Sequence, residues 1–414
     1  MLAALVAVAL VLVVAAVALG RTAQPSGRTV VTVRLWDQQV AAAYRESFAQ
    51  FTHEHPDIEV RVNVVSYATY FDTLRTDVAG GGADDIFWIN NSNFAEYADN
   101  GRLMPVDPEP GWEPSVVGQF TRNGVLWGVP QLTDAGIALY YNAELLAADG
   151  VSPAELGNAR WDPDPAVDTL RPLLARLTHG RQWGYNAAND LQGIYLNFIG
   201  SAGGVFTTGD RFAFDNPGAV TAFDYVVGLI NTDRVSPPAS DTNDNGDFSR
   251  NQFLAGRMAV FQSGTYNLAQ IAQQATFRWG VAMLPTGPAG RVSVTNGIVA
   301  AGNPASRNPA AVREVLAWLG GTRGNEFVGR HGAAIPAALP AQRAYFDYWS
   351  AKGVDVTPFF AVLQGPRIAA PGGAGFAAGY QAIKPYFDEM FLGRRPVAPT
   401  LAAAQGAANT AAQR

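Results

Sequence analysis

The stretch from residue 31 to residue 89 alternates between strand and helix patterns, and this order constrains the fold more than any other feature of the chain. Apolar and polar residues alternate in its strand patterns, while its helical patterns carry apolar residues about three or four places apart. The strand patterns lie at 31–35, 58–64 and 86–89, and the helical patterns lie at 40–51 and 70–78. A βαβαβ order predicts a parallel sheet with helices on its faces, and therefore an α/β fold.

Polar or aromatic residues follow each of the three strand patterns. They are Trp36 and Asp37, Ser66 and Tyr67, and Asn90 and Asn91. Ligands of open parallel sheets bind beyond the carboxyl ends of the strands, so we expect a site at this edge of the sheet. Any one of these residues could instead cap a helix or fill the core. The agreement of three strand ends favours a site.

Composition limits the class of protein. The chain has 414 residues, of which 48% are hydrophobic and 15% charged, so it is long enough for two globular domains. The net charge of −6 argues against a nucleic-acid-binding protein, which needs a basic surface. The sequence contains no cysteine, which excludes disulfides, thiolate nucleophiles and cysteine metal sites within it.

An uninterrupted apolar run occupies residues 2–19. Its length lies between that of a signal-peptide core and that of a membrane-spanning helix. Ala16-Val17-Ala18 offers the small residues of a signal-peptide cleavage site. We predict that residues 1–28 are either a signal peptide or an N-terminal membrane anchor, and that the folded part begins after them.

Three local patterns raise the alternative of an enzyme or a metal protein. Residues 241–246 begin like a calcium-binding loop, but Gln252 stands where that loop needs a bidentate glutamate. Asp84 and Asp85 could be a catalytic pair, but adjacent strand residues point to opposite faces, and Asp84 is expected to cap the turn before the third strand. Ser263 lacks the surroundings of a hydrolase nucleophile. We therefore predict no catalytic residue, no metal and no cofactor.

The second half of the chain is mainly helical, with loops rich in Gly and Pro between its elements. Helices are predicted at 218–231 and 308–330, and a strand at 279–284. Residues 396–414 are rich in Ala and weakly patterned, so we expect a frayed terminal helix there.

Residues 124–142 combine a turn with an apolar extended segment that carries one carboxylate, Asp134, in its middle. This stretch resembles the crossover segment of the extracellular solute-binding proteins of carbohydrate ABC transporters. Residues 253–259 resemble the Phe-x-x-Gly-Lys-Ala-Ala signature of that family, 279–285 its return crossover and 331–336 its Gly-x-x-Pro segment. The order and spacing of these motifs make the resemblance specific.

The resemblance implies an α/β, two-lobe periplasmic-binding-protein fold of type II, whose hinge-connected lobes close on a ligand in the cleft between them. It implies a first lobe at 29–135 plus 286–332 and a second lobe at 136–285 plus 333–414. The hinge is expected at about residues 133–141, 283–290 and 331–338.

The implied function is capture of a sugar or oligosaccharide outside the cytoplasm and its delivery to the permease subunits of an ABC importer. The implied protein is a monomer, held near the membrane by its permease or by residues 2–19. Another solute, such as a glycerol phosphodiester or a polyamine, is an alternative on the same fold. The contrasting class is an extracellular glycoside hydrolase, which would need two carboxylates about 5–10 Å apart.

The resemblance also implies a set of ligand-binding residues. They are Trp36, Asp37, Asn90, Asn91, Asp134, Asn189, Gln192, Thr265, Tyr266 and Asn296. Asp and Asn side chains suit sugar hydroxyls, which both donate and accept hydrogen bonds, and aromatic rings cover the apolar faces of the sugar. Tyr266 stands where the family frequently carries Trp, and its ring still offers a face for stacking.

Overall fold

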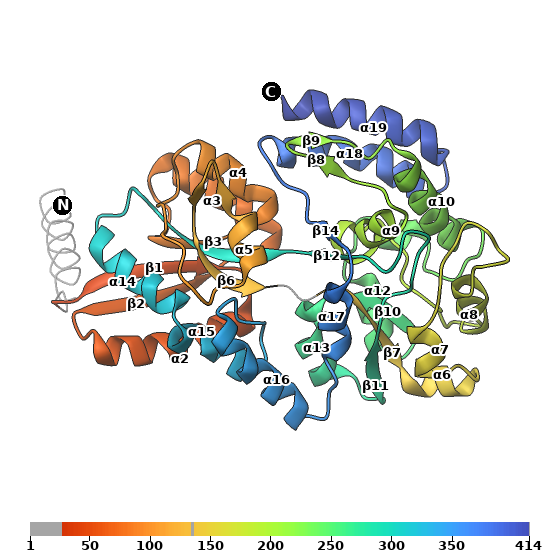
Figure 1. Ribbon diagram of the computed structural model, residues 1–414, viewed down its shortest axis with the longest axis horizontal. Coiled ribbons are helices and arrows are strands. Elements are labelled where there is room, and N and C mark those ends of the chain that lie inside the picture. Colours follow the sequence, from red (N-terminus) through yellow and green to blue (C-terminus); the bar gives the residue numbers. More distant parts are fainter. Residues whose placement is uncertain (1–26, 134–135, 414) are drawn as a thin grey trace, which may run out of the picture.

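Two separate β-sheets divide the protein into two lobes that lie side by side along its longest axis (Figure 1). The structure is a computed structural model that describes residues 27–133 and 136–413. The first lobe holds a five-stranded sheet in the order β2-β1-β3-β13-β6, and the second holds a three-stranded sheet in the order β10-β7-β11. The strands are β1 (Thr29–Leu35), β2 (Ile58–Val64), β3 (Ile86–Asn90), β6 (Val129–Thr133), β7 (Ala138–Asn142), β10 (Val260–Ser263), β11 (Trp279–Ala282) and β13 (Gly297–Gly302).

The first lobe begins with the predicted βαβαβ order. Helices α2 (Gln38–Glu54) and α3 (Tyr67–Gly80) connect β1, β2 and β3. β1 pairs in parallel with β2, where Leu35 lies opposite Val64, and β1 also pairs in parallel with β3. The predicted parallel sheet is therefore confirmed for these strands, and their carboxyl ends meet at one edge.

Four more helices complete the first lobe. They are α4 (Asn91–Asp99), α5 (Pro114–Gln119), α14 (Pro309–Gly320) and α15 (Thr322–Arg330). The helix predicted over 308–330 is thus two helices, because the backbone at Gly321 is extended, with φ −74° and ψ 151°. Val312, Val315 and Leu319 of α14 are buried, as their helical spacing predicts.

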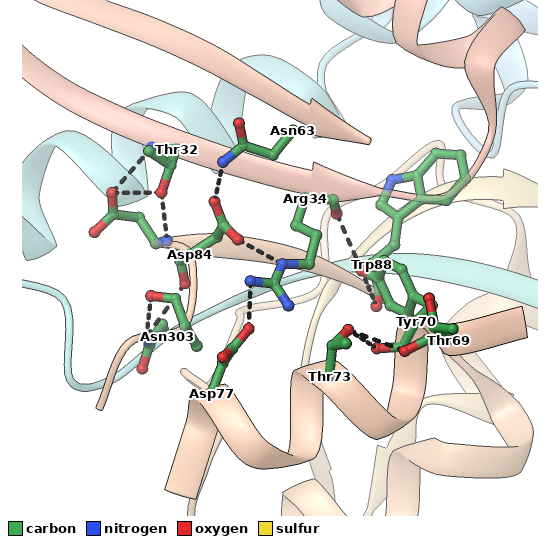
Figure 2. Close-up of polar contacts among 12 residues, drawn as sticks. Thr32, Arg34, Asn63, Thr69, Tyr70, Thr73, Asp77, Asp84, Trp88 and Asn303 are labelled. Atoms are coloured by element: carbon green, nitrogen blue, oxygen red, sulfur yellow. Dashed lines mark hydrogen bonds and ion pairs between the residues drawn. The ribbon is translucent and has the colours of Figure 1, made fainter. Parts of the chain in front are cut away.

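A network of charged and amide side chains joins β1, β2 and the segment before β3 to α3 (Figure 2). The Arg34 guanidinium donates from Nε to Asp84 at 2.5 Å and from Nη2 to Asp77 at 2.6 Å. The Asn63 amide donates to the other carboxylate oxygen of Asp84. The prediction that Asp84 caps a turn is wrong, because its carboxylate is the internal partner of Arg34.

The second lobe packs a thick helical layer against its small sheet. β7 pairs in antiparallel fashion with both β10 and β11. Helix α10 (Pro217–Asn231) confirms the helix predicted at 218–231, and α18 (Phe376–Phe391) and α19 (Val397–Ala412) lie against it and against each other (Figure 1). The expectation of a frayed terminal helix is wrong, since Leu401, Ala404 and Ala408 of α19 are buried in the core of this lobe.

The remaining elements are short. The helices are α6 (Ala143–Ala148), α7 (Pro153–Gly157), α8 (Leu170–Arg176), α9 (Leu196–Ser201), α11 (Ala239–Thr242), α12 (Phe248–Leu254), α13 (Leu268–Gln274), α16 (Gln342–Ala351) and α17 (Thr357–Ala361), with the π-helix η1 (Leu191–Tyr195) and the 3-10 helices η2 (Thr265–Asn267), η3 (Leu339–Ala341) and η4 (Val362–Gln364). The strands are β4 (Thr121–Arg122), β5 (Val125–Leu126), β8 (Thr207–Thr208), β9 (Arg211–Phe212), β12 (Ser293–Thr295) and β14 (Arg367–Ala369).

The chain passes between the lobes at three places, namely from β6 to β7, from β12 to β13 and from α15 to α16. The first and third passages touch, because the Thr133 N–H donates to the Ile335 carbonyl at 3.1 Å. The predicted lobe bounds and hinge segments concern which residues move together as one rigid body, and they stay a prediction.

Within the described part of the chain, none of the helices combines the length and the apolar character needed to cross a membrane. The apolar run at 2–19, which is predicted to be a signal peptide or an anchor, lies outside the described residues.

Candidate functional site

The carboxyl ends of β1, β2 and β3 bring the predicted strand-end residues to one edge of the first lobe. The register of the parallel strands aligns Leu35 with Val64, so Trp36 and Tyr67 follow neighbouring strands at that edge. Asn90 ends β3 on the other side of β1. The parallel topology therefore gathers residues that are more than 50 positions apart in the sequence.

Trp36 lies in an aromatic cluster at this edge. Its half-buried ring meets Tyr67, Tyr70 and Trp88 edge to face, with ring centroids 5.5, 4.9 and 5.0 Å away. The buried Tyr70 hydroxyl lies 3.1 Å from the Arg34 carbonyl oxygen and 2.9 Å from that of Trp88, which fixes the cluster to β1 and β3 (Figure 2). Tyr67 forms the outer wall of this cluster and is 58% exposed.

Asp37 and Asn90 are the N-terminal caps of two helices at this edge. The Asp37 carboxylate accepts from the backbone N–H groups of residues 39 and 40 at the start of α2, at 2.8 and 3.0 Å. The Asn90 side-chain oxygen accepts from the backbone N–H of Asn93 in α4, while its amide lies 3.4 Å from the Tyr67 hydroxyl. Capping thus holds both polar groups in place beside the aromatic cluster.

Asn91 contacts the second lobe. Its side-chain amide donates to the Ala370 carbonyl, and the neighbouring Ser92 hydroxyl donates to the Pro371 carbonyl at 3.1 Å. The strand-end residue Asn91 is therefore part of the junction between the lobes.

On the second lobe, Asp190 begins the π-helix η1. Its carboxylate accepts from the backbone N–H groups of Gln192 at 3.1 Å and Gly193 at 2.9 Å. Desolvation by the surrounding atoms raises the pKa of Asp190 and outweighs these two hydrogen bonds, which lower it. Asp190 as a whole residue is exposed, so water screens part of this effect. Single-turn π-helices are frequent at functional sites.

Tyr380 of α18 contacts the end of η1. Its hydroxyl lies 3.2 Å from the hydroxyl of Tyr195, the last residue of η1. Desolvation raises the pKa of Tyr380 to about 12, and the charges of Asp190, Tyr67 and Asp388 also act on it. The predicted site residue Asn189 donates to Asp388 at 3.1 Å. Helix α18 also packs against α4 of the first lobe, which begins directly after Asn90.

Three further predicted site residues lie in η2 and between β12 and β13. Thr265 is buried, and Tyr266, which is 49% exposed, packs its ring against Gly264. The Gly264 carbonyl accepts from the Tyr140 hydroxyl at 2.8 Å, which anchors this turn to β7. Asn296 lies between β12 and β13, where its side chain accepts from the next backbone N–H.

Three residues outside the predicted set lie at η1 and at the point of α18 that contacts it. They are Asp190, Tyr195 and Tyr380. Tyr67 follows the second parallel strand, and that position was a sequence signal for including it. The predicted residue Asp134 lies outside the described residues. The other members keep the positions given above, and their role in binding stays a prediction.

Other candidate sites lie elsewhere or have internal partners. Two surface cavities of about 440 and 430 Å³ lie along α18 and α19 and behind β14, away from the strand ends. In the described residues no group of three His, Asp or Glu side chains is arranged to hold a metal ion. Asp85 accepts from Thr32 and Ser306, and Asp84 faces Arg34, so the adjacent acids point to different partners.

Two α/β lobes with three chain passages, and with polar and aromatic residues where the lobes meet, define a solute-binding protein of the periplasmic type. The chain belongs to the bacterial extracellular solute-binding proteins, whose family model matches residues 36–326. The predicted two-lobe periplasmic-binding-protein fold is thereby confirmed. Family and fold identify a substrate-binding protein of an ABC transporter, and this family and fold are those of solute-binding proteins, which are not enzymes.

Three known proteins illustrate the similarity. A crystal structure of Mycobacterium tuberculosis UspC is 70% identical, with 92% of this chain and all of that chain covered and a TM-score of 0.78. An ABC substrate-binding protein from Listeria monocytogenes, solved in complex with cycloalternan, is 19% identical, with 92% and 98% covered and a TM-score of 0.81. A probable ABC transporter-binding protein of Deinococcus radiodurans is 28% identical over 51% of each chain, so the match spans about half the length of that relative.

Proposed function

We propose that the protein binds a sugar or oligosaccharide between its lobes and delivers it to the permease subunits of an ABC importer. One observation carries this proposal. Tyr67 and Tyr266, the exposed large aromatic residues of the described chain, are 58% and 49% exposed, one on each lobe, and Tyr67 lies beside the strand-end residues Trp36 and Asn90. Exposed aromatic rings beside hydrogen-bonding groups suit a ligand that has apolar faces and polar edges.

Capped carboxylates and amides supply the polar part of the proposed site. Asp37, Asn90 and Asp190 are each held by backbone N–H groups at the start of a helix. Sugar hydroxyls donate to carboxylates in charge-assisted bonds and exchange hydrogen bonds with amides. We propose that these residues and Tyr67 bind the ligand together with the predicted set. That set is Trp36, Asp37, Asn90, Asn91, Asp134, Asn189, Gln192, Thr265, Tyr266 and Asn296.

Similar proteins support a carbohydrate ligand. The Listeria protein named above was solved with cycloalternan, and a Thermotoga maritima neighbour was solved with maltose. We propose for this chain the same class of ligand, a site outside the cytoplasm, and closure of the two lobes around the ligand as the state that the permease recognises. We also propose the lobe bounds, the hinge segments and the monomeric state given above.

A ligand screen by thermal shift tests the proposal. A ligand that binds only the folded protein raises its melting temperature by mass action. We expect the full-length chain, purified in mild detergent, to respond to a mono-, di- or trisaccharide. A response confined to glycerol phosphodiesters or polyamines would retain the solute-binding fold and contradict the sugar assignment.

Variants of the two exposed tyrosines test the site. Once a sugar is found, Tyr67→Ala and Tyr266→Ala should each weaken its binding by about two- to tenfold, the loss expected for one aromatic contact. The matched control is Val205→Ala, since Val205 is 44% exposed at the cavity behind β14. Isothermal titration calorimetry measures all three, and affinities unchanged by both tyrosine variants would contradict the site.

A further inference from the structure

Two β-hairpins, one on each lobe, meet through the side chains of Arg122 and Asp210. On the first lobe, Asn123 and Gly124 form the two-residue loop between β4 and β5, with φ of 54° and 77°. Two positive φ values fit a type I′ turn, for which Asn-Gly is favoured. On the second lobe, Gly209 and Asp210 form the two-residue loop between β8 and β9, with φ of 58° at the glycine. Tight hairpins of this kind hold the residues at their tips in defined positions.

Arg122, next to the first hairpin tip, contacts carboxylates of both lobes. Its guanidinium donates to both Asp99 oxygens, from Nε at 2.5 Å and from Nη2 at 2.6 Å. Nη2 also lies 3.1 Å from the carboxylate of Asp210 at the tip of the second hairpin. Asp99 ends α4, where a negative charge opposes the helix dipole, so the arginine neutralises an unfavourable group in its own lobe.

The loop from β14 to α18 packs into the same junction at two glycines, Gly372 and Gly373. A Cβ atom at Gly372 would lie 2.5 Å from the Asn91 carbonyl oxygen of the first lobe. A Cβ atom at Gly373, whose φ is 119°, would collide with the Asp210 carboxylate. Glycine at both positions thus lets the loop approach α4 and places Asp210 between Arg122 and the loop.

We propose that Arg122, Asp99 and Asp210 form an electrostatic latch that favours the closed arrangement of the two lobes. Asp99 keeps Arg122 paired and oriented when the lobes separate, so of the contacts of Arg122 only those with Asp210 break on opening. Closure brings Asp210 to a guanidinium that is already in place, which reduces the entropy lost in forming the second pair. The hydrogen bonds from Asn91 and Ser92 to the carbonyls of residues 370 and 371 close the same side of the junction.

The lobe separation of the ligand-free protein tests the latch, and the test needs no sugar. The native chain has no cysteine, so Thr76→Cys on α3 and Gln381→Cys on α18 place one spin label on an exposed residue of each lobe. Double electron–electron resonance on the full-length chain in mild detergent then gives the distribution of distances between the labels. We expect Asp210→Asn to raise the ratio of open to closed molecules about two- to fivefold, the effect of one partly exposed ion pair.

Salt and a charge-matched variant provide the controls. About 1 M NaCl shortens the electrostatic screening length to about 3 Å. It should therefore shift the distance distribution of the native protein toward the open distances, and that of Asp210→Asn much less. Asp215→Asn removes the same charge from an exposed position of the second lobe and should leave the distribution unchanged. Arg122→Lys, which keeps the charge but loses the planar fork, should give an intermediate shift.

Two results would overturn the latch. The first is a distance distribution for Asp210→Asn that equals that of the native protein at both salt concentrations. The second is an equal shift in Asp210→Asn and Asp215→Asn, which would reflect net charge and not the contact with Arg122. A melting curve on each variant verifies folding, and Asp210 is 44% exposed, so its replacement should leave the fold intact.

Discussion

Arg34 and Arg122 are each held by two aspartates, and the two clusters differ in where their partners lie. Arg34 pairs with Asp84 and Asp77, and all three belong to the first lobe. Arg122 pairs with Asp99 of its own lobe and with Asp210 of the other. The Arg34 and Asp84 side chains are 10% and 7% exposed, whereas those of Arg122 and Asp210 are 25% and 44% exposed.

The difference in burial gives the two clusters different consequences. Burial lowers the pKa of Arg34, but its hydrogen bonds to Asp77 and Asp84 outweigh burial and leave the pKa raised. A buried charge that loses its partner has neither water nor a counter-ion, so this cluster cannot open while the lobe stays folded. The pair between Arg122 and Asp210 can separate into water at little cost. The buried cluster at Arg34 thus holds the first lobe together, whereas the exposed cluster at Arg122 permits the two lobes to separate.

Removing the buried carboxylate should produce the largest effect on stability. Asp84→Ala leaves Arg34 with one partner and leaves Asn63 without its acceptor, so we expect the free energy of unfolding to fall by about 3–5 kcal/mol. Urea unfolding followed by fluorescence measures the loss without adding salt. Asp57→Ala, at an exposed turn, is the control and should change stability by less than about 0.5 kcal/mol. A loss below about 1 kcal/mol for Asp84→Ala would place this cluster in the same energetic class as an exposed pair.

Packing at the junction between the lobes should produce the next largest effect. Gly373 has a φ of 119°, and a side chain there meets Asp210, so Gly373→Ala should cost about 1–3 kcal/mol. Gly353→Ala is the matched control, because Gly353 has a φ of 72° with open space around it and should lose about 1 kcal/mol from backbone strain alone. Urea unfolding of both variants separates contact from strain. Equal losses of unfolding free energy in the two variants would show that the residues around Gly373 move to make room for the added methyl group.

Local sequence patterns predicted those parts of the fold that depend on neighbours in the chain. The alternation at 31–35 and 58–64 gave the parallel strands, because a period of two defines which face is buried. The strand-end rule then gave Trp36, Asp37 and Asn90, since the carboxyl ends of parallel strands share an edge. Both hairpin loops are also visible in the sequence, as Asn-Gly and Gly-Asp between short β segments.

Contacts between distant segments could not be predicted in the same way. Tyr195 meets Tyr380 across 185 positions, and Arg122 meets Asp210 across 88 positions. No local period marks either pair, because each depends on how α18 and the β8–β9 hairpin pack in three dimensions. Asp84 shows the same limit, since a turn position predicted a cap, whereas the packing of α3 supplied a buried arginine.

The exposed pair should matter little to unfolding, and this sharpens the contrast with Asp84. We expect Asp210→Ala to lower the free energy of unfolding by less than about 1 kcal/mol, because the carboxylate is solvated in both states. Urea unfolding at the same ionic strength as for Asp84→Ala makes the two losses comparable. A loss of about 3 kcal/mol or more would show that the pair of Arg122 and Asp210 behaves like a buried ion pair. It would also show that this pair couples the unfolding of the two lobes.

Asp190 extends the comparison to a carboxylate that is held by backbone N–H groups without an arginine, and its effect should be the smallest. Desolvation raises the pKa of Asp190, so the folded protein holds this proton more tightly than the unfolded chain does. Its contribution to stability is therefore complete below the unfolded pKa of about 3.9 and is lost as the pH rises through the raised folded value.

The variant Asp190→Asn tests this, because it keeps an N-cap and removes the titration. Urea midpoints between about pH 4 and pH 7 should fall more steeply with rising pH in the native protein than in Asp190→Asn, while Asp215→Asn should keep the native slope. A native midpoint that rises with pH relative to Asp190→Asn would mean that the two backbone N–H groups stabilise the charge more than desolvation destabilises it.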